Sequence, residues 1–242
     1  MSIERVVLVT GSARRLGAAT VRQFHRRGWR VLIHCWQSRA EAAALAVELN
    51  ALRQNSAQML VADLQDRDAL QILAAEAVQC WGRLDALVNN ASTFYPTPIA
   101  KATQAQWQDL FGSNAQAPFF LTQALLPALR EARGSVINMA DIHGSRPLAE
   151  HSIYSMAKAA LLMLTKALAR ELAPEIRVNA IAPGAILWPQ GMDLETQEKM
   201  LATIPLQHLG TPEDIARTIA FLVMDAPYIT GQVIAVDGGR SI

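Results

Sequence analysis

Three side chains in the middle of the sequence can together move a proton. Tyr154 and Lys158 have the i, i+4 spacing that places two side chains on one face of a helix, and Asp141 precedes them. A free tyrosine has a pKa near ~10 and is a poor acid or base at neutral pH. We expect the ammonium group of Lys158 to lower the pKa of Tyr154 and to suit the pair for proton transfer. On its own, this spacing is more typical of an exposed pair on a helix surface.

A second chemical pattern lies near the N-terminus, between an apolar run at residues 6–9 and a helical stretch. Residues 10–17 read Thr-Gly-Ser-Ala-Arg-Arg-Leu-Gly, and such small residues let a backbone approach a pyrophosphate. The first amide groups of the following helix would point at that phosphate. In isolation, a plain strand-to-helix loop explains these residues equally well. The phosphate-binding interpretation is favoured because this turn is the first βα junction of the chain.

The end of the second apolar run indicates which dinucleotide binds. An acidic side chain at this position usually holds the ribose 2′-hydroxyl of NAD and would repel a 2′-phosphate. No carboxylate stands between His34 and Glu41, whereas Arg14, Ser38 and Arg39 can donate hydrogen bonds to a phosphate. We therefore predict NADPH as the cofactor. The alternative is that Arg14 and Arg39 are ordinary solvated arginines.

Short β-branched runs alternate with longer helical stretches along the whole chain, which is typical of a parallel sheet with crossover helices. With 242 residues, of which 51% are hydrophobic, the chain suits one large sheet with a buried core. We predict an α/β fold: a single-domain, Rossmann-type, doubly wound parallel sheet of about seven strands with helices on both faces, spanning residues 1–242. The expected strands are 6–9, 30–35, 58–61, 86–88, 135–138, 177–181 and 233–236. The expected helices follow the first turn to residue 27 and then span 39–52, 66–81, 105–130, 152–172 and 212–224. Residues 185–210 are less regular, and we expect them to form a substrate lid.

Charge and composition exclude several classes of protein. The 22 basic and 21 acidic residues give a net charge of +1 and form no basic stripe, so neither nucleic acid nor a membrane is an expected partner. The two cysteines lack the spacing of a metal site, and no metal is predicted. The first apolar run begins too early for a signal peptide to precede it, so we expect a cytoplasmic protein.

As a set, these motifs resemble the short-chain dehydrogenase/reductase family over essentially the whole chain. The matching segments are Thr10-Gly11 to Gly17, Asn89-Asn90-Ala91, Asn114, Tyr154-Ser155-Met156-Ala157-Lys158, Pro183-Gly184 and Val236-Asp237-Gly238-Gly239. The resemblance implies a homotetramer and a catalytic group of Asn114, Asp141, Tyr154 and Lys158. It also implies cofactor contacts by Gly11, Arg14, Arg15, Leu16, Gly17, His34, Ser38, Arg39, Asp63, Leu64, Asn90, Ala91, Ser92, Tyr154, Lys158, Pro183, Gly184 and Ile186.

Within that family the sequence is most similar to the pteridine, dihydrofolate and dihydromonapterin reductases. Arg15 stands where most family members have glycine, residues 90–98 resemble the segment that meets cofactor and pterin, and Asp141 replaces the usual catalytic serine. The resemblance implies reduction of a dihydropterin or dihydrofolate to its tetrahydro form, with Tyr154 as proton donor. Gln37 departs from the pattern, because an arginine is expected beside the 2′-phosphate; Arg39 would compensate. The implied substrate contacts are Arg15, Ser92, Phe94, Asp141, Tyr154 and Trp188.

The chemistry of Asp141 favours a pterin over a ketone. An ionised carboxylate only accepts hydrogen bonds and would repel a developing alkoxide. A pterin ring offers amino and N–H donors, and it needs a proton on a ring nitrogen when a C=N bond takes hydride. Phe94 adds a flat apolar face on which such a ring can stack.

Two other functions stay open: a ketone or 3-oxoacyl reductase of the same family, and a dinucleotide-binding sensor without turnover. Asp141 argues against the first, and the intact catalytic group argues against the second. Single residues also have plainer interpretations. Asp141 and Asp63 suit helix N-caps, Phe94 suits a core, and Asn114 suits a buried site bonded to backbone. The sequence does not separate dihydrobiopterin, dihydrofolate and dihydromonapterin.

Overall fold

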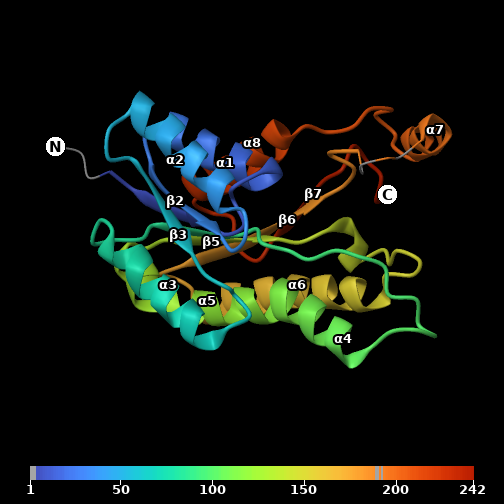
Figure 1. Cartoon of the computed structure of the whole chain (residues 1–242), viewed down its shortest axis with the longest axis horizontal. Helices are drawn as coiled ribbons and strands as arrows, with labels where there is room; N and C mark the ends of the chain where they lie inside the picture. The colour runs from blue at the N-terminus through green and yellow to red at the C-terminus, as the bar shows by residue number, and fades with distance from the viewer. Residues whose placement is uncertain (1–3, 189–190, 192) are drawn as a thin grey trace.

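The computed structural model, which describes residues 4–188, 191 and 193–242, contains one seven-stranded sheet between two layers of helices (Figure 1). The strands are β1 (Val6–Val9), β2 (Arg30–Cys35), β3 (Ala57–Val61), β4 (Ala86–Asn89), β5 (Ser135–Met139), β6 (Arg177–Pro183) and β7 (Val233–Val236). The helices are α1 (Arg15–Arg26), α2 (Arg39–Leu52), α3 (Arg67–Gln79), α4 (Gln104–Phe111), α5 (Ala117–Glu131), α6 (Ser152–Glu171), α7 (Leu194–Ala202) and α8 (Pro212–Met224). A π-helical turn, Gly112–Gln116, joins α4 to α5, and a short 3-10 helix, Ile142–Gly144, follows β5.

The sheet has the order β3-β2-β1-β4-β5-β6-β7, and every neighbouring pair is parallel. The chain adds β2 and β3 on one side of β1 and then returns to add β4 on the other. In doubly wound sheets, ligands bind outside the carboxyl ends of the strands at this reversal. The predicted fold class is confirmed, and the topology places any cofactor site beyond β1 and β4.

Two apolar layers hold the helices on the sheet. α1, α2 and α8 cover one face, and α3, α5 and α6 cover the other (Figure 1). On the first face the rings of Phe24 and Trp29 pack edge to face, 5.2 Å apart. On the second face Leu121 and Leu125 of α5 are fully buried. The four residues of β1 are all buried, as expected for a parallel strand covered on both sides.

The predicted single helix over 105–130 is wrong in one respect: it is divided by the π-helical turn. Within this turn the side-chain amide of Asn114 donates to the carbonyl of Leu110 at 2.9 Å and so competes with the backbone ladder. Pro118 falls in the first turn of α5, where its missing N–H costs little. Pro127 lies within α5.

The segment 185–210, predicted to be irregular, contains the helix α7. Asp193 caps it by accepting from the amide of Thr196 at 2.8 Å. No residue of α7 is buried, so this helix lacks the buried apolar face on which the prediction of helices from sequence depends. Residues 189, 190 and 192 of the expected lid lie outside the described residues.

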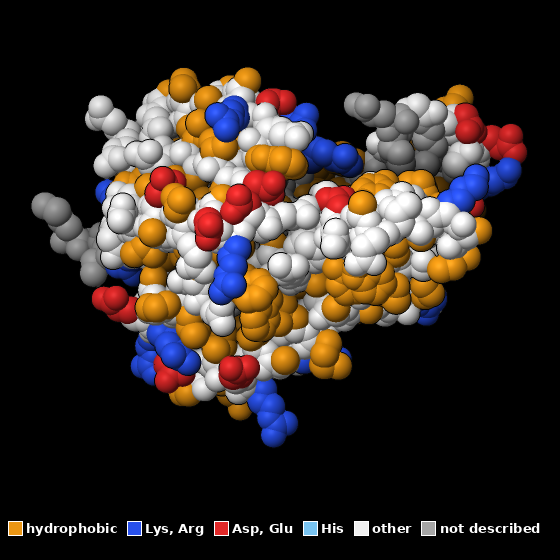
Figure 2. Space-filling view, turned by 60° about the horizontal axis from the view of Figure 1, so that its bottom comes forward, with side chains coloured by type: hydrophobic (Ala, Val, Ile, Leu, Met, Phe, Trp, Pro, Cys, Tyr) orange, Lys and Arg blue, Asp and Glu red, His pale blue; other side chains and the backbone are white. Residues whose placement is uncertain are grey.

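Large apolar side chains are exposed on the layer formed by α4, α5 and α6. Figure 2, in which this layer faces the viewer, shows hydrophobic side chains gathered over it. Trp107, Phe119, Met156 and Met163 are among the exposed ones. Such a patch is typical of a surface that another protein covers. Separately, none of the helices described is both long and apolar enough to span a bilayer.

Candidate active site

A cavity of about 840 Å³ opens at the carboxyl edge of the sheet, around the ends of the strands β1 to β6. It falls within the size range of sites that bind cofactors and small molecules. Every predicted site residue lines it except Arg39, Asn114 and Trp188. Arg39 is exposed at the start of α2, and Asn114 is buried behind the residues that line the cavity. Trp188 is half-buried and follows Leu187, which does line the cavity.

Several lining residues had no signal in the sequence. Thr93 and His143 neighbour predicted residues, but Met200 and Arg240 come from α7 and from the last turn of the chain. Neither belongs to a motif. Only the fold brings them to the same cavity, so a reading of local patterns misses them.

The turn after β1 is packed too tightly for side chains at its glycines. Gly11 has φ +58°, and a Cβ there would lie 2.8 Å from the Cα of Ala91. A Cβ on Gly17 would lie 2.6 Å from the carbonyl oxygen of Gly11. Asn90 fixes the turn, because its side-chain amide donates to the carbonyls of Thr10 at 2.8 Å and of Gly11 at 3.0 Å. This bare backbone beside the start of α1 fits a pyrophosphate group.

Arg15, in the same turn, also has a left-handed backbone conformation, with φ 51°. Side chains other than glycine, asparagine and aspartate rarely adopt this conformation. Residues held in such a conformation cluster at functional sites. Arg15 also lines the cavity, so this conformation occurs at the candidate site.

His34 braces the same turn. Its Nδ1 accepts from the amide of Gly11 at 3.0 Å, and its Nε2 lies 3.1 Å from the carbonyl of Ala62. Because the amide needs an acceptor, Nε2 carries the proton and donates to that carbonyl. Burial lowers the pKa of His34 to about 4. The ring is therefore neutral, and it positions the turn without adding positive charge.

The groups near the end of β2 match the predicted 2′-phosphate edge in part. Gln37 and Ser38 line the cavity, as does Arg14, whose guanidinium lies 3.4 Å from Glu41. Both of these side chains are largely exposed, so the pair is weak and open to competition by an anion. Asp63, at the end of β3, lines the cavity and also accepts from the amide of Gln65 at 2.9 Å.

The carboxylate of Asp141 makes two hydrogen bonds, one to Tyr154 of α6 and one to the 3-10 helix that follows β5. One carboxylate oxygen accepts from the hydroxyl of Tyr154 at 2.7 Å, and the other caps the 3-10 helix by accepting from the amide of His143 at 2.8 Å. The N-cap interpretation of Asp141 is thus correct, and its second oxygen is bonded to the hydroxyl of Tyr154 at the cavity. Lys158 donates to the carbonyl of Met139 at 2.8 Å, and its Nζ lies 5.6 Å from the centre of the Tyr154 ring.

The expected direction of the Tyr154 pKa is wrong. Burial raises the pKa of Tyr154, and the charge of Asp141 and the hydrogen bond to it raise it further; Ser92 opposes them. The Nζ of Lys158 donates to the backbone carbonyl of Met139, and among the described residues it makes no hydrogen bond to the hydroxyl of Tyr154. Burial lowers the pKa of Lys158 to about 8, while Asp141 opposes that change. The phenol therefore holds its proton at neutral pH and is a proton donor.

Phe94 lies in the cavity and not in a core. Its side chain is 55% exposed, so the core interpretation is wrong. The ring stacks on His151 with centres 4.7 Å apart and meets Tyr154 edge to face at 4.8 Å. An aromatic face therefore lies beside the Tyr154 hydroxyl and Asp141.

Asn114 lies behind the cavity and holds the segment of Ser92 and Thr93 in place. Its amide nitrogen donates to the carbonyls of Thr93 and Leu110, each at 2.9 Å, and its oxygen accepts from the hydroxyl of Ser92 at 2.6 Å. The buried, backbone-bonded interpretation is correct. Through Ser92 and Thr93, the same side chain also positions the segment that carries Phe94.

A doubly wound sheet with a phosphate-type turn and a Tyr-Lys pair at its carboxyl edge defines the class of dinucleotide-linked oxidoreductases. Comparisons with known proteins agree. A family model described as enoyl-(acyl carrier protein) reductase matches residues 11–241. Pteridine reductase 1 of Leishmania tarentolae is 37% identical, covering 98% of this chain and 96% of its own. A 3-oxoacyl-(acyl-carrier-protein) reductase of Staphylococcus aureus is 35% identical, covering 99% of each chain. Protein FixR of Bradyrhizobium diazoefficiens is 36% identical, covering 98% of this chain and 87% of its own.

The chain belongs to the short-chain dehydrogenase/reductase family and is an oxidoreductase. Reductases of this family use a nicotinamide dinucleotide, which agrees with the turn and cavity described above. The pteridine reductase and the 3-oxoacyl reductase are similarly identical to this chain. Overall sequence identity therefore does not distinguish a pterin substrate from a 3-oxoacyl substrate.

Proposed function

We propose that this protein uses NADPH to reduce a dihydropterin or dihydrofolate to its tetrahydro form in the cytoplasm. The observation that carries the proposal is the 2.7 Å hydrogen bond from the hydroxyl of Tyr154 to Asp141. A carboxylate beside the proton donor accepts from the amino and N–H groups of a nitrogen heterocycle, whereas a ketone offers it no donor. Phe94 adds an aromatic surface for a flat ring.

The chain's own residues bind, orient and protonate the substrate. When bound, the dinucleotide supplies the hydride. The turn of Gly11 to Gly17 would hold its phosphates, and Arg14 and Ser38, which line the cavity, would bind the 2′-phosphate. Asp141 orients the pterin by accepting its N–H groups. Tyr154 donates its proton to the ring nitrogen that becomes basic as the bond is reduced, and the raised pKa of the phenol keeps that proton in place until then.

A substrate panel tests the proposal directly. We expect the value of kcat/KM with dihydrobiopterin or dihydrofolate to exceed that with a diketone by about 100-fold or more, because only the pterins satisfy the acceptor at Asp141. The oxidation of NADPH, followed by its absorbance, measures all three side by side. The 3-oxoacyl reductase relative supports carbonyl reduction as a second candidate. A diketone or 3-oxoacyl thioester turned over faster than either pterin would establish that candidate instead.

The choice of dinucleotide gives a separate prediction. We expect a lower KM for NADPH than for NADH, because Arg14 offers a guanidinium and Glu41 is only loosely paired with it. Arg14→Gln should raise the KM for NADPH by about tenfold, the effect of one charged hydrogen bond, and leave the KM for NADH nearly unchanged. Lys101→Gln removes one exposed positive charge outside the cavity and is the matched control. A preference for NADH, or equal effects of Arg14→Gln on both, would refute the assignment.

The pH dependence follows from Lys158. Burial lowers its pKa from 10.5 to about 8, so its ammonium group is lost as pH rises through that value. We expect kcat/KM to fall across the same range, because the positive charge beside Tyr154 disappears while the phenol stays protonated. Because the unfolded chain keeps its proton up to pH 10.5, the free energy of unfolding should rise between pH 8 and 10.5. Initial rates over this range and denaturant titrations measure the two effects. A rate that stays constant through pH 10.5 would contradict the role of Lys158.

We also propose a homotetramer. The exposed apolar side chains of α4, α5 and α6 form a surface suited to association (Figure 2). Light scattering of the purified protein measures the number of chains.

A further inference from the structure

A second cavity, of about 210 Å³, lies at the amino edge of the sheet, opposite the candidate active site. Residues just before or at the starts of β1, β4, β5 and β6 form it, together with the ends of α5 and α8. In Figure 1 this is the edge nearest the N-terminus. Its volume is below that of sites for nucleotides or drug-sized ligands and suits one small group.

Basic side chains dominate the lining. Arg5, Arg83, Arg133 and Arg177 face one carboxylate, that of Asp85. Arg83 holds both oxygens of Asp85 at 2.8 and 2.5 Å, and the amide of Val6 also donates to it at 2.8 Å; the exposed Glu131 acts on Arg83 as well. Arg177 donates to backbone carbonyls at the end of α8, among them that of Leu222 at 2.7 Å. Asp85 is thus fully engaged, and positive charge remains in excess.

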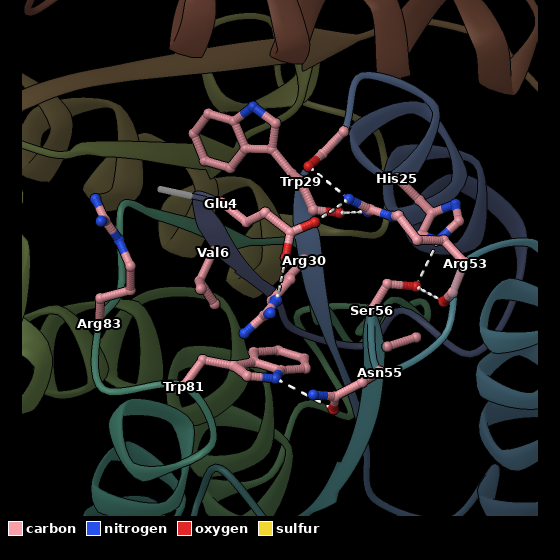
Figure 3. Close-up of polar contacts among 12 residues, drawn as sticks. Glu4, Val6, His25, Trp29, Arg30, Arg53, Asn55, Ser56, Trp81 and Arg83 are labelled. Carbon is pink, nitrogen blue, oxygen red and sulfur yellow. Dashed lines mark hydrogen bonds and ion pairs between the residues drawn. The ribbon is translucent and has the colours of Figure 1, made fainter. Parts of the chain in front are cut away.

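Three arginines at this cavity, Arg5, Arg133 and Arg177, have no ion-pair partner among the described residues. The guanidinium group of Arg177 is bonded to backbone carbonyls, which leaves those of Arg5 and Arg133 with neither an ion pair nor a hydrogen bond to a described residue. Arg5 lies over the ring of Trp29, 5.7 Å from its centre. The neighbouring arginines differ. Figure 3 shows Arg30 and Arg53 converging on Glu4, at 2.7 and 2.9 Å, with Val6 between Arg30 and Arg83.

The wall of the cavity also includes a hydrogen-bond donor that has no partner among the described residues. Ser135, the first residue of β5, is only 2% exposed, and its hydroxyl has no hydrogen-bond partner among the described residues. A buried hydroxyl left unpaired costs stability, and such groups are rare in folded proteins. An acceptor in the cavity would satisfy it. The guanidinium groups of Arg5 and Arg133 and the hydroxyl of Ser135 would all be satisfied by a hydrogen-bond acceptor that carries negative charge.

We propose that this cavity binds a phosphate group, recognised by Arg5, Arg133 and Ser135. A tetrahedral dianion accepts hydrogen bonds in several directions and matches the two unpaired cations in charge. A carboxylate has one charge and a planar pair of oxygens, so it matches less well. The proposal concerns a site remote from the dinucleotide and does not depend on which substrate is reduced.

The test titrates inorganic phosphate into protein already saturated with reduced dinucleotide, which occupies the phosphate-binding turn at the other edge. Potassium chloride keeps the ionic strength constant, and acetate is the comparison anion. We expect calorimetry to give a saturable phosphate isotherm, weaker binding of acetate, and a Tm that rises with phosphate. Equal effects of phosphate, acetate and chloride would show charge screening alone and would overturn the proposal.

Three variants decide whether the binding occurs in this cavity. Arg133→Gln and Ser135→Ala should each weaken the affinity for phosphate by about tenfold or more, the effect of one hydrogen bond to a charged group. Without phosphate, Ser135→Ala should melt at or above the wild-type Tm, because it removes an unpaired hydroxyl. Lys101→Gln, which removes one charge elsewhere, should bind phosphate as the wild type does. If Ser135→Ala and Arg133→Gln retain wild-type affinity, the site is refuted, whether or not the chain reduces pterins.

Discussion

Replacing Tyr154 with phenylalanine is expected to lower kcat for dihydropterin reduction by about 100- to 10,000-fold, the usual contribution of a positioned proton donor. The ring is 4% exposed, and phenylalanine keeps its shape, so the edge contact with Phe94 is retained. What disappears is the proton and the hydrogen bond to Asp141. Binding of reduced dinucleotide, measured by fluorescence titration, should hardly change, because the phosphate turn lies on another segment.

The chain provides a matched control for this variant. The hydroxyl of Tyr95 also donates to a carboxylate, that of Asp109, at 2.8 Å, but Tyr95 does not line the cavity. Tyr95→Phe therefore loses the same kind of hydrogen bond and should keep most of its activity. If both variants lost activity equally, the loss would report packing and not proton donation. Full activity in Tyr154→Phe would remove the phenol from the mechanism.

Most of the fold was predictable because strands covered on both faces appear as continuous apolar runs. The buried β1 and the runs that form β2 and β5 are recognisable without any knowledge of their partners. The π-helical turn does not appear in the apolar pattern, because it depends on a side chain, Asn114, bonding to the backbone of its own helix and to Ser92. Helix α7 was missed because none of its residues is buried.

The same distinction applies to the candidate site: residues in local motifs could be predicted, whereas residues brought together only by the fold could not. Motifs located the phosphate turn, Tyr154 and Asp141, because each needs a residue type at a fixed spacing. Arg240 was not found, because it belongs to no motif and meets the cavity only through the fold. The predicted direction of the Tyr154 pKa was wrong because the ring is buried and because its hydroxyl faces Asp141 and not Lys158. The i, i+4 spacing places Lys158 near the ring, but Nζ is bonded to Met139 while the hydroxyl faces Asp141.

The Asp141→Ser variant is expected to exchange one substrate class for the other. We expect kcat/KM for a dihydropterin to fall by about 100-fold, since the acceptor for its N–H groups is lost, and that for a diketone to rise. A serine hydroxyl donates to a carbonyl oxygen and does not repel a developing alkoxide. Loss of the charge also removes one cause of the raised Tyr154 pKa, which makes the phenol a stronger acid.

The local fold should survive this change, because serine and asparagine cap helices about as well as aspartate, and the 3-10 helix after β5 needs only the cap on His143. Asp141→Asn keeps the shape and one acceptor oxygen but not the charge. If the charge of Asp141 is needed for pterin reduction, Asp141→Asn should lose pterin activity as Asp141→Ser does. Wild-type activity in Asp141→Asn would show that the shape of the side chain is sufficient. A parallel fall with pterin and diketone in Asp141→Ser would mean that the carboxylate only supports the loop. Opposite changes with the two substrates can arise only if the group at this position contacts the substrate or tunes its proton donor, because damage to the fold lowers both rates together.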